Sequence, residues 1–187
     1  MYKTVIEVID RLLREKEIVT VAIDGRCASG KTTLADMLAK HYDANLFHMD
    51  DFFLRPSQRT PERFAEAGGN VDRERFLEEV LLPLEKGEPF IYRPYDCATQ
   101  ALGDAVSIQP KRLNVIEGSY SCHPLLFAHY DLHVFLTVDA DTQMCRICKR
   151  NGEEKAKIFR KRWIPLEEAY FAAFAVADRC EIQIHTK

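Results

Sequence analysis

The chain has 187 residues, a formal net charge of −3 and a hydrophobic content of 47%. This length fits one folded domain with a sizeable core, so we expect residues 1–187 to form a single domain. The nearly balanced charge excludes a disordered acidic chain and argues against nucleic-acid binding. No apolar run approaches the roughly 18 residues of a membrane span. Acidic residues near the N-terminus argue against a targeting peptide, so we expect a cytoplasmic protein that binds no membrane.

The first 40 residues predict a helix, a buried strand and a second helix. Across residues 3–16, Val5, Ile9, Leu12 and Leu13 fall on one helical face, with charged residues opposite. Residues 18–24 form a short apolar run rich in β-branched residues, which is typical of a buried strand. Residues 34–40 then repeat apolar side chains at helical spacing.

The stretch between that strand and the second helix matches G-x-x-x-x-G-K-[ST], the phosphate-binding loop of nucleotide triphosphatases. The predicted nucleotide-binding residues are Gly25, Arg26, Cys27, Ala28, Ser29, Gly30, Lys31, Thr32 and Thr33. The glycines allow a close approach to an anion, and the N–H groups at the helix start form an anion-binding nest. Lys31 supplies charge for the β- and γ-phosphates, and the Thr32 hydroxyl can bind Mg²⁺. The alternative is an ordinary glycine turn at a helix start, which the flanking strand and helix disfavour.

Predicted strands and helices alternate along the rest of the chain. Strands are expected over residues 44–49, 113–118, 132–138 and 181–184, and helices over 73–82, 140–150 and 154–176. Residues 55–72 are expected to form a long loop, and residues 89–95 and 106–108 short extended segments. The alternation predicts an α/β fold of the P-loop NTPase type, with a parallel sheet of about five strands sandwiched by helices. In such a fold the site lies at the C-terminal ends of the strands.

Acidic residues follow two of the predicted strands. Asp50 and Asp51 end the second strand and Glu117 ends the third, so all three are expected at the sheet edge that carries the phosphate loop. Asp50 is placed to accept the proton of an attacking hydroxyl. Glu117 suits the acid that holds the Mg²⁺ water shell. The alternatives are solvated acids that cap a turn and, for Glu117, an ordinary strand-end residue.

A basic segment over residues 146–162 follows the fourth predicted strand. It contains eight Lys or Arg residues and two Glu residues. Such a run is often only a solvated helix face. Its place after the strand also suits a helical lid that closes over phosphates, with Asn151-Gly152 as a break in the helix. Nucleic-acid binding is a third use of such a run, which the acidic remainder of the chain disfavours.

These motifs together resemble the uridine kinase and phosphoribulokinase group of P-loop kinases, with nicotinamide riboside kinase as a close relative. The resemblance covers nearly the full length. Its most specific element is Met49-Asp50-Asp51-Phe52-Phe53, and Asn70-Val71-Asp72, Tyr95-Asp96 and Val115-Ile116-Glu117-Gly118 also match. The resemblance implies an ATP- or GTP-dependent, Mg²⁺-requiring kinase that phosphorylates the 5′-hydroxyl of a nucleoside. It is compatible with a homo-oligomer.

The same resemblance implies roles for individual residues. Asp50 would deprotonate the substrate hydroxyl, and Asp72 would accept hydrogen bonds from the ribose hydroxyls. Tyr95 falls where uridine kinases place an aromatic residue against the base. The implied substrate-binding residues are Asp50, Phe53, Asp72, Arg93, Tyr95 and Gln100, and the implied catalytic residues are Asp50, Lys31, Arg146 and Arg150, with both arginines on phosphates.

Two departures keep the substrate open. Gln100 stands where uridine kinases have a histidine that recognises the pyrimidine, and the basic segment lacks their dense arginine repeat. A kinase of another small alcohol, such as nicotinamide riboside or pantothenate, is therefore the second reading. A regulatory ATPase is the third. A GTPase switch is disfavoured because the N-K-x-D and D-x-x-G motifs are absent from the chain.

Overall fold

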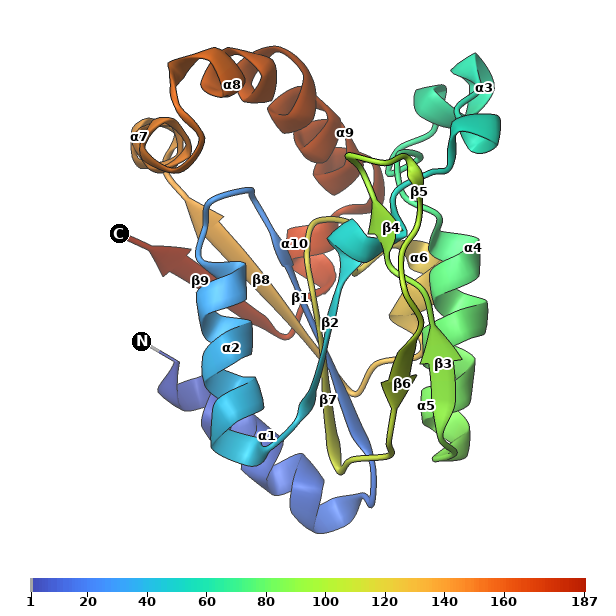
Figure 1. Cartoon of the computed structure of the whole chain (residues 1–187). Helices are drawn as coiled ribbons and strands as arrows, with labels where there is room; N and C mark the ends of the chain where they lie inside the picture. Colours follow the sequence, from blue (N-terminus) through green and yellow to red (C-terminus); the bar gives the residue numbers. More distant parts are fainter. Residues whose placement is uncertain (1) are drawn as a thin grey trace.

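The computed structural model describes residues 2–187 and is built around a five-stranded parallel sheet (Figure 1). The strands are β1 (Val19–Gly25), β2 (Asn45–His48), β7 (Leu113–Glu117), β8 (Leu132–Val138) and β9 (Ile182–Thr186). They lie in the order β2-β7-β1-β8-β9, with every pairing parallel. The predicted α/β sheet of about five strands is confirmed, and β1, which leads into the phosphate loop, lies at its centre.

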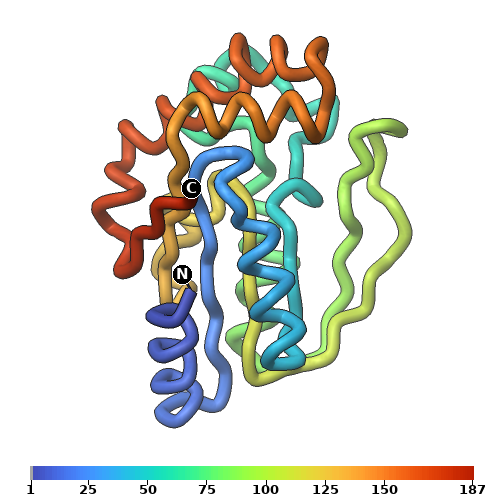
Figure 2. The backbone as a smooth tube through the Cα atoms, turned by 90° about the vertical axis from the view of Figure 1, so that its left-hand side faces the viewer, coloured from blue at the N-terminus to red at the C-terminus, as the bar shows by residue number. Residues whose placement is uncertain are grey.

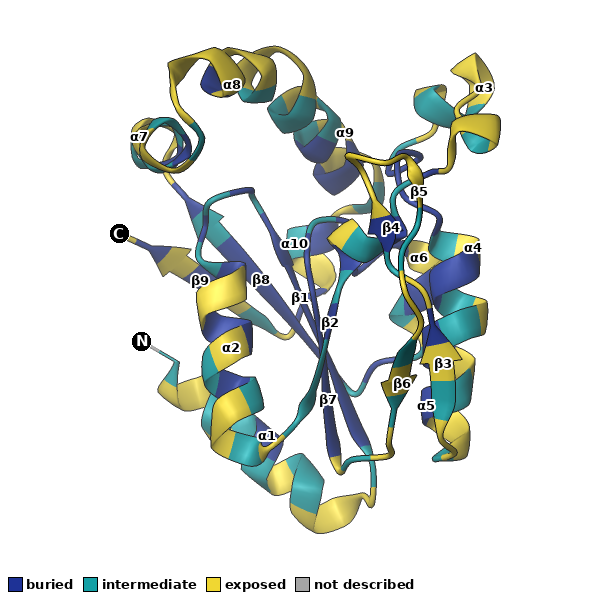
Figure 3. Cartoon of the chain, in the orientation of Figure 1, coloured by how far each residue is buried: buried dark blue, intermediate teal, exposed yellow. Residues whose placement is uncertain are grey.

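Helices cover both faces of this sheet because side chains alternate along each strand. On one face, α1 (Lys3–Glu15) and α2 (Lys31–Tyr42) pack Val5, Ile9 and Leu34 against Val21 and Ile23 of β1. The other face is covered by α4 (Arg73–Phe76), the π-helical turn η3 (Leu77–Leu81), α5 (Leu82–Lys86), α9 (Ile164–Phe174) and α10 (Val176–Arg179). Figure 3 shows the buried sheet between these partly exposed helices.

Short elements replace the long loop expected over residues 55–72. The short 3-10 helices η1 (Met49–Phe52) and η2 (Pro56–Gln58) precede the short α-helix α3 (Pro61–Ala65). Thr60 accepts a hydrogen bond from the Arg63 N–H at 3.1 Å, which caps α3. The loop prediction was therefore wrong in part, because capping and the two prolines order a segment that has no apolar periodicity.

The expected extended segments over residues 89–95 and 106–108 form small antiparallel pairs. Strand β3 (Phe90–Tyr92) pairs with β6 (Val106–Ile108), and β4 (Tyr95–Asp96) pairs with β5 (Ala101–Leu102). A short helix, α6 (Pro124–Phe127), joins β7 to β8. None of the described helices is long and apolar enough to cross a lipid bilayer.

The basic segment is helical and broken once. Helix α7 (Ala140–Asn151) ends at Gly152, whose φ of +80° interrupts the helix before α8 (Glu153–Ile158). The turn η4 (Phe159–Trp163) then continues into α9 without a break. Figure 2 shows α7 and α8, in orange, lying across the end of the molecule that carries the phosphate loop. The break at Asn151-Gly152 is thus confirmed, and we call residues 146–162 the lid segment.

Candidate active site

The phosphate loop takes a backbone path that its sequence requires. Gly25 has a φ of +133°, and a Cβ at this position would lie 1.9 Å from the carbonyl oxygen of Leu136, so any other residue would collide with β8. Ala28 and Gly30 also have positive φ values, +59° and +97°. These conformations turn the loop's N–H groups toward the start of α2, where the helix dipole favours an anion.

Lys31 holds its charge inside this loop. Its side chain is largely buried, and Nζ donates to the carbonyl oxygens of Gly25 at 2.7 Å and Arg26 at 2.9 Å. Ser119, just beyond β7, lies 3.4 Å from the same ammonium. The loop is therefore a preformed positive site on the floor of the cavity described next.

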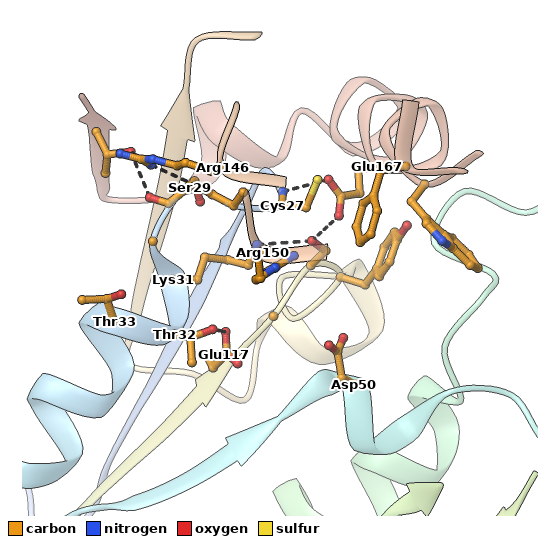
Figure 4. Close-up of a pocket in the computed structure, with 18 of the residues that line it drawn as sticks. Cys27, Ser29, Lys31, Thr32, Thr33, Asp50, Glu117, Arg146, Arg150 and Glu167 are labelled. Atoms are coloured by element: carbon orange, nitrogen blue, oxygen red, sulfur yellow. Dashed lines mark hydrogen bonds between the residues drawn. The ribbon is translucent and has the colours of Figure 1, made fainter. Parts of the chain in front are cut away.

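A cavity of about 720 Å³ opens over the loop, which is within the range of small-molecule sites (Figure 4). Its walls come from the phosphate loop, the ends of β7 and β9, the turn η1 and the lid segment. Figure 4 places Thr33 and Arg146 on one side of this cavity and Asp50 on the other. We call these the Thr33 end and the Asp50 end. Tyr2, Thr186 and Lys187 also line the cavity.

The two predicted metal ligands, Thr32 and Glu117, lie close together beside the loop. Thr32 Oγ1 lies 3.4 Å from Glu117 Oε2, and Glu117 is mostly buried at the end of β7. The other oxygen of Glu117 lies 2.7 Å from His48 Nδ1, a contact that raises the pKa of His48. His48 pairs with Glu117 in the β2–β7 register, so its contact with the acid is set by the sheet. We did not predict His48, although it ends the strand that precedes Asp50.

The two adjacent acids after β2 turn in different directions. Asp50 lines the cavity, and burial, followed by the nearby Glu117 carboxylate, raises its pKa. Asp51 lies outside the cavity lining, and Tyr92 Oη lies 3.4 Å from its Oδ2. Of the two acids, Asp50 is therefore the one that faces the cavity.

The other predicted substrate residues lie mostly outside the cavity. Phe53 lines it, but Asp72, Arg93, Tyr95 and Gln100 do not. Asp72 is buried as the N-cap of α4 and accepts hydrogen bonds from Arg75 N and from Gln58 Nε2 at 2.8 Å. The substrate roles of these four residues stay predictions.

The small antiparallel strand pairs hold Tyr95, Arg93 and Gln100 outside the cavity lining. Tyr95 is buried, and its Oη accepts a hydrogen bond from Arg59 at 2.7 Å. Arg93 Nε donates to the carbonyl oxygen of Gly103 at 2.8 Å, and Gln100 is exposed at the turn before β5 with a φ of +56°. The side chains of Tyr95 and Arg93 are therefore held by hydrogen bonds at the strand pairs, and that of Gln100 is exposed to solvent.

Both predicted lid arginines line the cavity. Arg146 Nη1 donates to the carbonyl oxygen of Ala28 at 3.0 Å and to Thr186 Oγ1 at 3.2 Å, which ties α7 to the phosphate loop and to β9. Arg150 Nε donates to Asn151 Oδ1 at 2.8 Å. The assignment of these arginines to phosphates stays a prediction.

Glu167 of α9 is a buried acid that sequence reasoning missed. Its Oε2 accepts a hydrogen bond from the Cys27 N–H at 2.9 Å, and its Oε1 accepts one from Ser119 Oγ at 2.8 Å. A carboxylate oxygen on a loop amide indicates that this loop can bind an anionic oxygen. Glu167 lies about 140 residues from the loop, so no local sequence signal reveals the contact.

Asp24, at the end of β1, is a second buried acid that we did not single out. Its carboxylate accepts hydrogen bonds from the N–H groups of Gly25 at 2.6 Å, Tyr120 at 3.3 Å and Cys122 at 2.9 Å. Tyr170 Oη donates a fourth at 2.8 Å. Asp24 therefore joins the phosphate loop to the segment after β7 and to α9. Complete burial raises the pKa of Asp24 to about 6, although its hydrogen-bond donors act in the opposite direction and lower the pKa.

This raised pKa predicts a pH-dependent stability. Folding favours the protonated form of Asp24, so that contribution is present below about pH 4 and is lost as the pH rises through about 6. The free energy of unfolding of the wild type minus that of Asp24→Asn should fall by roughly 2 kcal/mol between about pH 4 and pH 7. Urea unfolding of both proteins across this range measures the difference. A pH-independent difference would contradict the raised pKa.

The phosphate loop, the acids at the strand ends and the five-stranded sheet define a P-loop kinase. The family model described as deoxynucleoside kinase matches residues 21–185, so the chain belongs to the deoxynucleoside kinase family. The comparison with curated proteins gave no match.

Many solved structures share this fold, including the following three. A protein of Bacillus stearothermophilus described as a possible uridine kinase is 20% identical over 97% of this chain and 99% of that chain, with a TM-score of 0.69. A candidate fructose transport system kinase of Silicibacter sp. TM1040 is 23% identical over 90% of both chains, with a TM-score of 0.69. The D-glycerate 3-kinase of Cryptococcus neoformans is 17% identical over 82% of this chain and 79% of that chain, with a TM-score of 0.57.

Proposed function

We propose that the protein is an ATP- or GTP-dependent kinase that phosphorylates the 5′-hydroxyl of a nucleoside. The observation that carries this proposal is the position of Asp50, an acid that lines the same cavity as the phosphate loop and its lysine. A regulatory ATPase has no need for an acid placed like Asp50. The deoxynucleoside kinase family match supports the nucleoside as acceptor.

The proposed reaction uses a small number of groups. The 5′-oxygen of the acceptor attacks the γ-phosphorus, the bond from that phosphorus to the β-phosphate oxygen breaks, and the hydroxyl proton passes to Asp50. The raised pKa of Asp50 suits this role, because a more basic carboxylate accepts a proton more readily. Lys31 and the loop N–H groups stabilise the negative charge on the phosphates.

The residues also fit a magnesium ion, which neutralises phosphate charge when bound. Thr32 and Glu117 would hold it, one directly by its hydroxyl and one through bound water. Among the described residues, no group of three or more His, Cys, Asp or Glu side chains could hold a metal. A site with few protein ligands is what Mg²⁺ takes when nucleotide phosphates supply the rest.

The second candidate is a kinase of another small alcohol, such as nicotinamide riboside or pantothenate. It is supported by the names of the fold neighbours, which include a fructose transport system kinase and a glycerate kinase. The chemistry at Asp50 and Lys31 is the same in both candidates, so the acceptor is the only difference to be tested.

A coupled ADP-release assay against a panel of acceptors tests the function. The panel holds uridine, cytidine, deoxycytidine, adenosine, nicotinamide riboside, pantothenate, fructose and glycerate, with ATP or GTP and Mg²⁺. We expect acceptor-dependent turnover with at least one nucleoside. Turnover with nicotinamide riboside, pantothenate, fructose or glycerate alone would favour the second candidate. Acceptor-independent ADP release that no compound stimulates would overturn the kinase proposal.

A further inference from the structure

Four aromatic side chains line the cavity. Phe53 and Tyr120 come from the body of the protein, in the segments that follow β2 and β7. Phe159 and Trp163 come from the turn η4, Phe159 within the lid segment and Trp163 directly after it, and we call these two residues the lid aromatics. Of these four, the sequence predicted only Phe53 as a substrate-binding residue, and the other predicted aromatic contact was Tyr95, which lies outside the cavity lining.

The two lid aromatics lie on one face of a continuous helix. Phe159, Trp163 and Glu167 are spaced four residues apart across η4 and α9, and all three line the cavity. Glu167 fixes this face to the body of the protein through Cys27 N–H at 2.9 Å and Ser119 Oγ at 2.8 Å. Phe159, about two turns from Glu167, packs against the apolar cluster of Cys27, Ile147 and Ala156, and the guanidinium carbon of Arg150 lies 6.0 Å from its ring centre.

Further contacts connect Trp163 with the segment that follows Phe53. The guanidinium carbon of Arg162 lies 4.6 Å from the centre of the Trp163 ring and 5.9 Å from that of Phe64. Phe64 belongs to α3, and Figure 1 shows α3 on the opposite side of the molecule from α7, which carries Arg146 of the Thr33 end. Trp163 is thus assigned to the Asp50 end of the cavity, where the acceptor is expected.

The body side of this end is held rigidly. Tyr120 is almost fully buried and packs edge-to-face on Tyr170, with ring centres 5.0 Å apart. Phe53 pairs through its backbone with Val71, beside Asn70. The Asn70 side chain is 7% exposed and lines the cavity, so it can donate to and accept from a polar ring edge.

We propose that Phe159 and Trp163 pack against a planar ring of the acceptor, with Phe53 and Tyr120 on the body side, so that the lid aromatics select acceptors that carry an aromatic base. The proposal rests on the kinase function above and assigns its substrate class. A small sugar or glycerate has no planar ring, so four aromatic side chains would make few stacking contacts with such an acceptor. Aromatic rings bind flat bases through their π-faces with little dependence on base identity.

Trp163 supplies a direct test because it is the only tryptophan in the chain. Its fluorescence is titrated with uridine, cytidine, deoxycytidine and adenosine, and with ribose, fructose and glycerate as matched acceptors without a base. We expect saturable changes in emission with nucleosides and none with the others at equal concentrations. Equal changes with ribose or glycerate, or no change with any nucleoside, would overturn the proposal. This readout needs no turnover.

Substitutions of the lid aromatics test the same assignment through kinetics. Trp163→Leu and Phe159→Leu should each raise the KM for the nucleoside by about 10- to 100-fold, as expected for the loss of one base–aromatic contact. The KM for ATP should change by less than about twofold. Trp163→Phe should restore most of the nucleoside affinity. Ile158→Ala is the control, because this neighbour of Phe159 is 52% exposed and lies outside the cavity lining.

The outcomes separate this proposal from the function on which it rests. If fructose or glycerate is phosphorylated and nucleosides are not, the kinase stands and the aromatic-acceptor proposal falls. If nucleosides are phosphorylated but Trp163→Leu and Phe159→Leu leave their KM unchanged, the substrate class stands and the role of the lid aromatics falls. If nucleosides change Trp163 emission but no acceptor is phosphorylated, the kinase function falls and the binding site remains.

Discussion

Replacing Lys31 by methionine should reduce phosphoryl transfer by on the order of 10³-fold, because it removes the charge that stabilises the transferring phosphate. Methionine keeps an unbranched stem of similar length, so the packing of this largely buried side chain is retained. Turnover of the best acceptor from the panel, with ATP and Mg²⁺, measures the loss.

Lys40→Met is the matched control for this substitution. Lys40 lies on the same helix, α2, but is exposed near its C-terminal end. We expect its activity to stay within about twofold of wild type, since charge at the surface and far from the loop has little effect. Thermal unfolding of both variants separates lost chemistry from lost folding. Wild-type turnover in a folded Lys31→Met variant would contradict the proposed kinase.

Asp50→Asn should lower kcat by about 10²- to 10⁴-fold and change the KM for ATP little. An amide keeps the size of the side chain but cannot take the proton of the attacking hydroxyl. Steady-state kinetics with the nucleoside and with ATP varied in turn measure both effects. A loss of nucleotide affinity with an unchanged kcat would instead assign Asp50 to the metal site.

Asp51→Asn is a stringent control, because it makes the same chemical change at the next residue. Asp51 lies outside the cavity lining, beside the hydroxyl of Tyr92. We expect its kcat to remain within about threefold of wild type. Equal losses in both variants would indicate that the acids act through the folding of η1 rather than through proton transfer.

Most of the fold could be predicted because its signals are local. The five strands are short apolar runs, and the amphipathic pattern of residues 3–16 produces α1 with Val5 and Ile9 buried. The break at Gly152 follows from a positive φ that glycine adopts freely. Residues 55–72 were predicted as a loop because η2 and α3 depend on capping and proline rather than on apolar spacing.

The site could be predicted only where its residues carry a motif or end a strand. Gly25 to Thr33 are contiguous, and Asp50 and Glu117 are brought to the same edge by parallel strands. Asp24, His48 and Glu167 escaped notice because their partners are distant in sequence. His48 meets Glu117 across 69 residues, and Glu167 meets Cys27 across 140.

The sequence by itself determined the class of chemistry, since the order of Gly25, Gly30, Lys31 and Thr32 dictates a loop whose N–H groups and charges face an anion. Only the tertiary structure decided which side chains share the cavity with that loop. It separates Asp50 from Asp51, keeps Tyr95 and Gln100 outside the lining and brings Phe159 and Trp163 into it. The reason is physical: a backbone path depends on nearby residues, whereas a cavity wall depends on packing between segments that only the folded chain brings together.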